Sequence, residues 1–135
     1  MVKMNLEYLG NLKVKAQHEQ SGAVIHTAAP KDNNGDGSSF SPTDLLCTSL
    51  ASCIMTILGI RSRELGWELE GLKINLEKHM TTEPRRIGRI SMNFEVPLGF
   101  PKEDQSKFQQ FVFECPVCNS ISDQIELDYE FFFAE

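Results

Sequence analysis

Residues 41–66 have the sequence SPTDLLCTSLASCIMTILGIRSRELG, which carries the strongest helix signal of the chain. Ser41 suits the N-cap and Pro42 the first helical position, and Asp44 follows Ser41 by three residues, as in a capping box. Gly66 provides a stop. We therefore expect a helix between Pro42 and Gly66, about 36 Å long at the standard rise. Its middle is apolar on nearly every side, so we expect other surfaces to cover it all round.

In the segments before and after this helix in the sequence, apolar residues alternate with polar ones, which is typical of half-buried strands. Two such segments precede the helix and form a hairpin around the turn Gln20-Ser21-Gly22. Gly88, between Ile87 and Ile90, interrupts the alternation and predicts a β-bulge. A second helix and a short helical turn precede a closing strand. The expected strands are 12–17, 23–29, 72–77, 90–96 and 125–133, and the expected later helices are 101–114 and a turn from Pro116.

The order β-β-α-β-β-α-α-β predicts an α+β fold in which a largely antiparallel sheet packs on a long central helix. With 135 residues and 15.2 kDa, we expect one domain over 1–135. The net charge of −6 disfavours a nucleic-acid partner. The uncharged run Leu45–Ile60 is short and contains polar residues, so we expect a core helix and no membrane span. The N-terminus lacks an apolar signal core, which predicts a cytoplasmic location with reduced thiols.

Two of the four cysteine contexts are informative. Cys53 lies mid-helix, where the simplest interpretation is core packing; Cys47 points about 120° away, so the two are no local pair. Cys115-Pro116-Val117-Cys118 is a C-x-x-C motif, which suggests redox chemistry or half of a zinc site. We expect Cys115 at a helix start, where backbone N–H groups lower a thiol pKa. Zinc is disfavoured because there is no second C-x-x-C and the histidines are scattered.

Other motifs carry weaker signals. The loop from Asp32 to Gly37 resembles the start of a calcium-binding loop, but Thr43 stands where a bidentate Glu is needed, so we expect a plain turn. Arg85 follows Pro84 at a predicted hairpin tip, where an arginine is either solvated or delivers a cation to a thiolate or carboxylate. Neither a phosphate-binding motif nor a dinucleotide motif is present, and we expect no cofactor and no bound metal.

The contexts of Cys53 and Cys115, taken together, resemble the OsmC/Ohr family of thiol peroxidases. The likeness rests on Ser41-Pro42-x-Asp44-Leu45-Leu46 leading to Ala51-Ser52-Cys53, and on Cys115-Pro116-Val117 after a second helix. It implies that Cys53 attacks an organic hydroperoxide, that Cys115 resolves the product, and that an external dithiol reduces the resulting disulfide. It also implies an intertwined homodimer. The all-apolar helix and Phe132, on the polar face of the closing strand, agree with such a dimer.

The chain departs from the family pattern at the activating groups. Typical members have an Arg in the N-terminal strands and, in the Ohr branch, a Glu at the position of Thr43. Arg85 is our preferred substitute cation, because the Pro84-Arg85 hairpin resembles a less characterised OsmC-like subgroup; Lys13, Lys15 and His18 are alternatives.

Two other functions stay open. The first is a non-catalytic module that binds an apolar ligand or senses oxidation, which the absence of the usual Arg and Glu favours. The second is a dithiol-disulfide exchanger that uses Cys115 and Cys118. Cys118 is either a second resolving thiol or a packing residue.

Overall fold

The structure is a computed structural model that describes residues 1–135. The chain divides into two compact units, Met1–Leu46 and Cys47–Glu135. Because one helix runs from the first unit into the second, this division does not test the prediction of one domain. The elements are β1 (Met4–Gly10), β2 (Lys13–His18), β3 (Val24–Ala28), η1 (Lys31–Asn33), α1 (Pro42–Leu65), β4 (Lys73–Thr81), β5 (Arg86–Val96), η2 (Lys102–Asp104), α2 (Gln105–Phe111), η3 (Val112–Glu114), η4 (Cys118–Ser120) and β6 (Glu126–Phe133).

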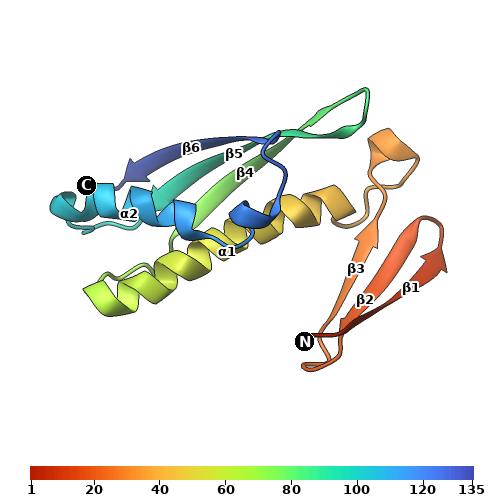
Figure 1. Cartoon of the computed structure of the whole chain (residues 1–135), viewed down its shortest axis with the longest axis horizontal. Coiled ribbons are helices and arrows are strands. Elements are labelled where there is room, and N and C mark those ends of the chain that lie inside the picture. The colour runs from red at the N-terminus through yellow and green to blue at the C-terminus, as the bar shows by residue number, and fades with distance from the viewer. The chain divides into compact units, whose positions relative to one another are not determined.

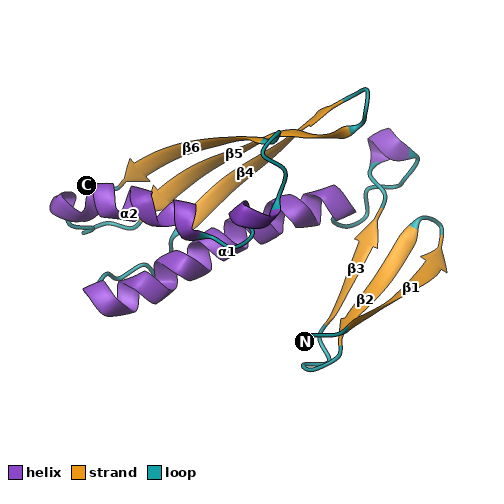
Figure 2. Ribbon diagram, in the orientation of Figure 1, coloured by secondary structure: helices purple, strands orange, loops and turns teal.

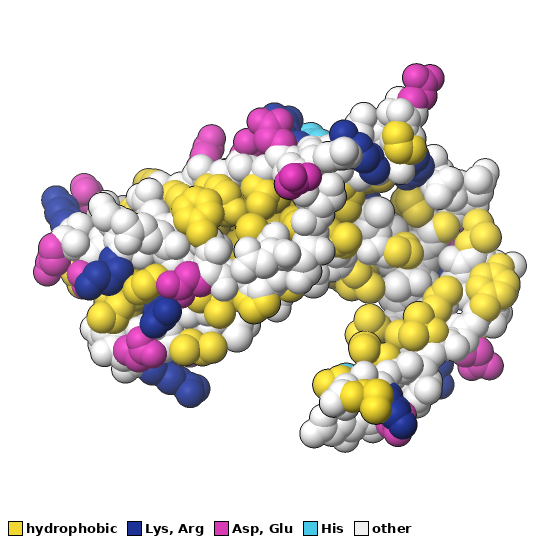
Figure 3. Space-filling model, viewed as in Figure 1, with side chains coloured by type: hydrophobic (Ala, Val, Ile, Leu, Met, Phe, Trp, Pro, Cys, Tyr) yellow, Lys and Arg dark blue, Asp and Glu magenta, His cyan; other side chains and the backbone are white.

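The first unit contains an antiparallel sheet in the order β1-β2-β3 (Figure 2). The hairpin of β2 and β3 was predicted and is confirmed, whereas β1 is an additional strand. Leu6, Ala16 and Ile25 lie side by side across the sheet, and Tyr8 pairs with Val14 on the same face, since side chains alternate along each strand. This face is apolar and open: Leu6 is 69% exposed. Hydrophobic side chains of this sheet are visible at the surface in Figure 3.

Helix α1 begins and ends where the sequence predicts. The amide of Ser41 donates to Asp44 Oδ2 at 2.9 Å, and the Asp44 amide donates to Ser41 Oγ at 3.1 Å, which is a reciprocal capping box. At the other end Gly66 has φ +74, and its amide caps Ser62 O at 2.9 Å. The helix is therefore fixed by local interactions at both ends.

Within the second unit, only one side of α1 is covered. Leu50, Ile54 and Leu58 are fully buried, whereas Ile60 is 52% exposed. By length and composition alone the helix could cross a membrane, contrary to what its short uncharged run indicated, and 28% of its most apolar window is buried. Its buried side packs into the hydrophobic core, as in a core helix of a soluble fold. The second unit alone does not provide the expected covering on all sides.

The second unit contains a sheet in the order β4-β5-β6, with α1 and α2 on the same face (Figure 1). Strands β4 and β5 are antiparallel, and the predicted bulge is confirmed: His79 pairs with Arg89 and Met80 with Ile87, leaving Gly88 as the extra residue. Strand β6 runs parallel to β5, so the sheet of this unit is mixed, where a largely antiparallel sheet was predicted. Parallel neighbours need a long connection, and the segment through α2 and the short helical turns is long enough to return the chain from the end of β5 to the level at which β5 begins.

The core of this unit is formed by β5 and the two helices. The side chains of Ile90, Met92, Phe94 and Val96, on one face of β5, are at most 2% exposed and lie in one cluster with Leu50 and other core residues. The predicted helix over 101–114 is a short α-helix flanked by two 3-10 turns, η2 and η3. The α+β class is confirmed, and the core fixes the turn 115–118 close to α1.

Candidate functional site

Cys53 and Cys115 lie in contact in the second unit. Cys53 is half-buried on α1, and Cys115 directly follows η3 and is fully buried. The Cys115 thiol donates to the carbonyl oxygen of Leu50, one turn before Cys53, at 3.9 Å. The thiols of Cys53 and Cys115 are also within hydrogen-bonding contact of each other. The structure thus brings together the two cysteines that the sequence singled out, although they are far apart in the chain.

The pKa of the Cys115 thiol is raised to about 11, chiefly by burial and then by the neighbouring Cys53. Backbone N–H groups of Cys118 and Val117 point at the sulfur and offset this only in part. The expectation of a lowered pKa at a helix start is therefore wrong. The helical turn here, η4, has only three residues, and loss of solvent around the sulfur outweighs the local amides.

Tyr129 brings a hydroxyl group to the same place. Its hydroxyl is buried and makes no hydrogen bond. The pKa of Tyr129 is raised to about 12, chiefly by burial and then by the nearby thiols of Cys118 and Cys115. The ring is held by Phe113, with centroids 5.4 Å apart, and stacks on Phe131 at 6.4 Å. Three thiols and one phenol are therefore gathered between α1, the 115–118 turn and β6. The sequence marked Tyr129 only as an apolar position of the closing strand.

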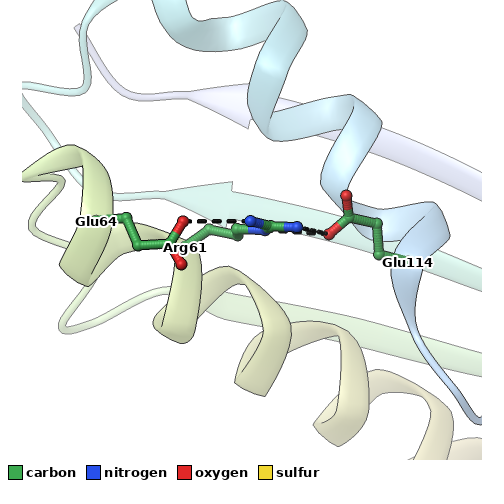
Figure 4. Close-up of polar contacts among 3 residues, drawn as sticks. All are labelled: Arg61, Glu64 and Glu114. Carbon is green, nitrogen blue, oxygen red and sulfur yellow. Dashed lines mark hydrogen bonds and ion pairs between the residues drawn. The ribbon is translucent and has the colours of Figure 1, made fainter.

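An ion pair ties the segment before Cys115 to α1 (Figure 4). Arg61 Nη2 and Nε donate to one oxygen of Glu114 at 2.8 and 3.1 Å, and Nη1 binds Glu64 at 3.2 Å. The guanidinium also lies over the ring of Phe111, 4.9 Å from its centroid. Because Glu114 directly precedes Cys115, this pair restrains the backbone that carries the Cys115 thiol. Sequence reasoning missed it, since no pattern links residues so far apart.

Arg85 lies in the exposed turn 82–85 between β4 and β5. The groups that act on the Cys115 thiol are the thiol of Cys53 and the backbone amides of Val117 and Cys118, and Arg85 is not among them. Its assignment as the activating cation stays a prediction.

The remaining sequence motifs lie elsewhere. Asp36, in the loop that resembles a calcium site, pairs with Lys13 at 3.1 Å and accepts from the Ser38 amide at 3.0 Å. Its pKa is lowered to about 2, chiefly by the Ser38 side chain, so the carboxylate is already engaged in a turn. No group of three or more His, Cys, Asp and Glu side chains is placed to hold a metal ion.

Comparisons with known proteins agree with this architecture. A family model described as OsmC-like protein matches residues 35–130. A proposed osmotic-stress-induced and detoxification-response protein from Psychrobacter arcticus superposes with a TM-score of 0.93 and 36% identity, over 98% of this chain and 96% of that one. An OsmC-like protein from Mycoplasma pneumoniae has a TM-score of 0.83 and 17% identity, over 100% and 98%.

An organic hydroperoxide resistance protein OsmC from Legionella pneumophila has a TM-score of 0.75 and 15% identity, over 97% and 96%. At this identity the likeness concerns the fold alone. No curated protein matches the chain.

Proposed function

The chain belongs to the OsmC family, and from this premise we propose that it is a thiol peroxidase that reduces organic hydroperoxides. The observation that carries the proposal is the contact between Cys53 and Cys115 beside the Leu50 carbonyl. Solved structures of the same fold include a protein described as an organic hydroperoxide resistance protein. We also expect the reducing cytoplasm as its location, where thiols are kept reduced.

The proposed reaction has two steps. The Cys53 thiolate attacks the terminal peroxide oxygen, the O–O bond breaks, the alkoxide leaves as an alcohol after protonation, and Cys53 becomes a sulfenic acid. The Cys115 thiolate then attacks the Cys53 sulfur, and hydroxide leaves as water. An external dithiol reduces the resulting disulfide. The apolar surroundings, which include Leu50 and Val112, favour an alkyl substituent on the peroxide.

We further propose that a second copy of the chain covers the open apolar surfaces. The face of the β1–β3 sheet that carries Leu6 and Tyr8 covers no core of its own unit, with Tyr8 64% exposed. Phe132 on β6 is 65% exposed, and most of the apolar window of α1 is open. Apolar surface of this extent is typical of an oligomer interface.

A second function is favoured by the electrostatics of Cys115. Its pKa is raised to about 11, first by burial, and no positive group acts on it. A thiol kept protonated in this way resolves a sulfenic acid slowly, which would suit a redox sensor or an apolar-ligand-binding module better than an enzyme.

Turnover of cumene hydroperoxide with a dithiol reductant tests the proposal. We expect Cys53→Ser to abolish turnover, because the attacking sulfur is lost. Cys47→Ala is the matched control: it removes a buried thiol of the same helix and is expected to keep most activity. The rate of wild-type oxidation by the peroxide is measured by stopped-flow. A rate constant no larger than that of a free thiol would favour the sensing module instead.

A further inference from the structure

A third thiol, Cys118, lies beside the Cys53–Cys115 pair and has no part in the reaction above. We propose that Cys118 attacks the Cys53–Cys115 disulfide at the Cys115 sulfur, moving the disulfide into the 115–118 pair and releasing Cys53. This inference rests on the proposed function, because the peroxide reaction must first form the disulfide.

The 115–118 turn holds the backbone of Cys118 next to the Cys115 sulfur. The turn is closed by the Asn119 amide on Cys115 O at 3.3 Å and by Ser120 Oγ on Pro116 O at 2.8 Å. Within it the Cys118 amide points at the Cys115 sulfur, so the backbone of Cys118 is already against that atom. A C-x-x-C turn of this kind lies within the span that a disulfide can bridge.

Tyr129 is suited to stabilise the attacking thiolate. Its buried hydroxyl has no hydrogen-bond partner, and an unpaired buried hydroxyl is costly unless a partner forms at some stage. The polar groups that interact with this hydroxyl are the thiols of Cys118 and Cys115. As a protonated phenol, Tyr129 donates a hydrogen bond to the Cys118 sulfur when that sulfur ionises. Tyr129 is thus a positioning residue for Cys118.

The exchange step balances without a further reagent. The Cys118 thiolate forms a bond to the Cys115 sulfur, the Cys53–Cys115 bond breaks, and Cys53 leaves as a thiolate. The hydroperoxide is the oxidant throughout, and an external dithiol is the final reductant.

The exchange frees Cys53 before the reductant acts. Each disulfide has one half-buried sulfur, Cys53 in the first and Cys118 in the second, so the dithiol can still attack after the move. Cys53, meanwhile, is free to meet a second peroxide.

Disulfide mapping without a reductant tests the exchange. Wild-type protein receives two equivalents of cumene hydroperoxide, is quenched by alkylation at intervals, and is digested and mapped by mass spectrometry. We expect a 53–115 bridge first, its replacement by a 115–118 bridge, and consumption of about two peroxides per chain with a trappable sulfenic acid on Cys53.

Variants separate the exchange from the peroxidase reaction. Cys118→Ser and Cys118→Ala are expected to keep the 53–115 bridge and to consume about one peroxide per chain, at an unchanged first-phase rate. Tyr129→Phe, which keeps the packed ring, is expected to slow replacement of the bridge several-fold while leaving the first phase unchanged. Cys47→Ala again serves as the control.

The two proposals fail in different ways. A wild-type protein that rapidly consumes one peroxide and retains only the 53–115 bridge overturns the exchange and leaves the peroxidase intact. A wild-type protein that reacts no faster than free cysteine overturns both.

Discussion

The thiol of Cys115 lies 3.9 Å from the carbonyl oxygen of Leu50, across 65 positions of sequence. This contact holds the Cys115 thiol against the turn of α1 that leads from Leu50 to Cys53. The same placement buries the sulfur completely and surrounds it with apolar core residues. The site therefore combines a short path between two sulfurs with a Cys115 thiol that is hard to ionise, and in the proposed reaction this combination determines how disulfide formation depends on pH.

We expect formation of the 53–115 disulfide to accelerate with pH. The pKa of Cys115 is raised from 9.0 to about 11, so at neutral pH only a small fraction is thiolate, and that fraction grows about tenfold per pH unit below the pKa. The rate, measured by stopped-flow after one equivalent of peroxide, should rise steeply from pH 7 to 9. The titratable side chains that interact with Cys115 are Cys53 and Tyr129, and Tyr129 stays neutral in this range because its pKa is about 12.

The Cys115→Ser variant provides the comparison for this pH profile, because it cannot form the 53–115 disulfide. In it, the rate of sulfenic acid formation on Cys53 is measured by trapping with a dione reagent. A rate of disulfide formation that is flat between pH 7 and 9 in the wild type would contradict a protonated resolving thiol.

Arg61→Gln is expected to slow disulfide formation several-fold without slowing the attack on peroxide. The arginine binds Glu114 at 2.8 Å, and without it the backbone before Cys115 is less restrained against α1. Stability should change little, because the pair is at the surface. The measurement is the same stopped-flow assay, with Tm from circular dichroism as the check on folding.

Glu64→Gln is the matched control for Arg61. It removes the 3.2 Å pair on α1 but leaves the Glu114 pair in place, so disulfide formation should keep the wild-type rate. Equal slowing in both variants would mean that helix charge, and not the link to Glu114, determines the rate.

Arg85→Gln tests the remaining sequence-based assignment. If Arg85 stabilises the attacking thiolate, oxidation of Cys53 should slow by about tenfold or more, the size of effect that a lost charged partner produces. Arg86→Gln is the control on the neighbouring residue, whose guanidinium donates to its neighbour's carbonyl, Ile87 O. Equal rates in wild type and Arg85→Gln would assign thiolate activation to another group.

Local signals account for what could be predicted of the fold. The capping pair Ser41 and Asp44 and the stop at Gly66 fixed the bounds of α1 in advance, and Gly88 marked the bulge, because each depends on a few neighbouring residues. Strand β1 carries the same alternation, Met4, Leu6 and Tyr8 against Asn5 and Glu7, so its signal was present but was missed.

What could not be predicted depends on distant parts of the chain. Alternation shows that 125–133 is a strand but not its direction, and β6 proved parallel to β5. The pairing of Cys53 with Cys115 came from resemblance to a family and not from spacing. The raised pKa of Cys115 was missed because burial is set by the whole core, and the position of Tyr129 is equally non-local.

Leu6→Glu should break the proposed dimer. Leu6 lies in the middle of the apolar face of the β1–β3 sheet, next to Ala16, and is 69% exposed in the single chain, so a carboxylate there is tolerated in a monomer but is buried unpaired in an interface. We expect the dissociation constant to rise by about 100-fold or more. Sedimentation should then give the 15.2 kDa of one chain instead of twice that mass. Glu7→Lys, on the opposite face of β1, should leave the dimer intact, and a wild type that sediments as a monomer would remove the proposal.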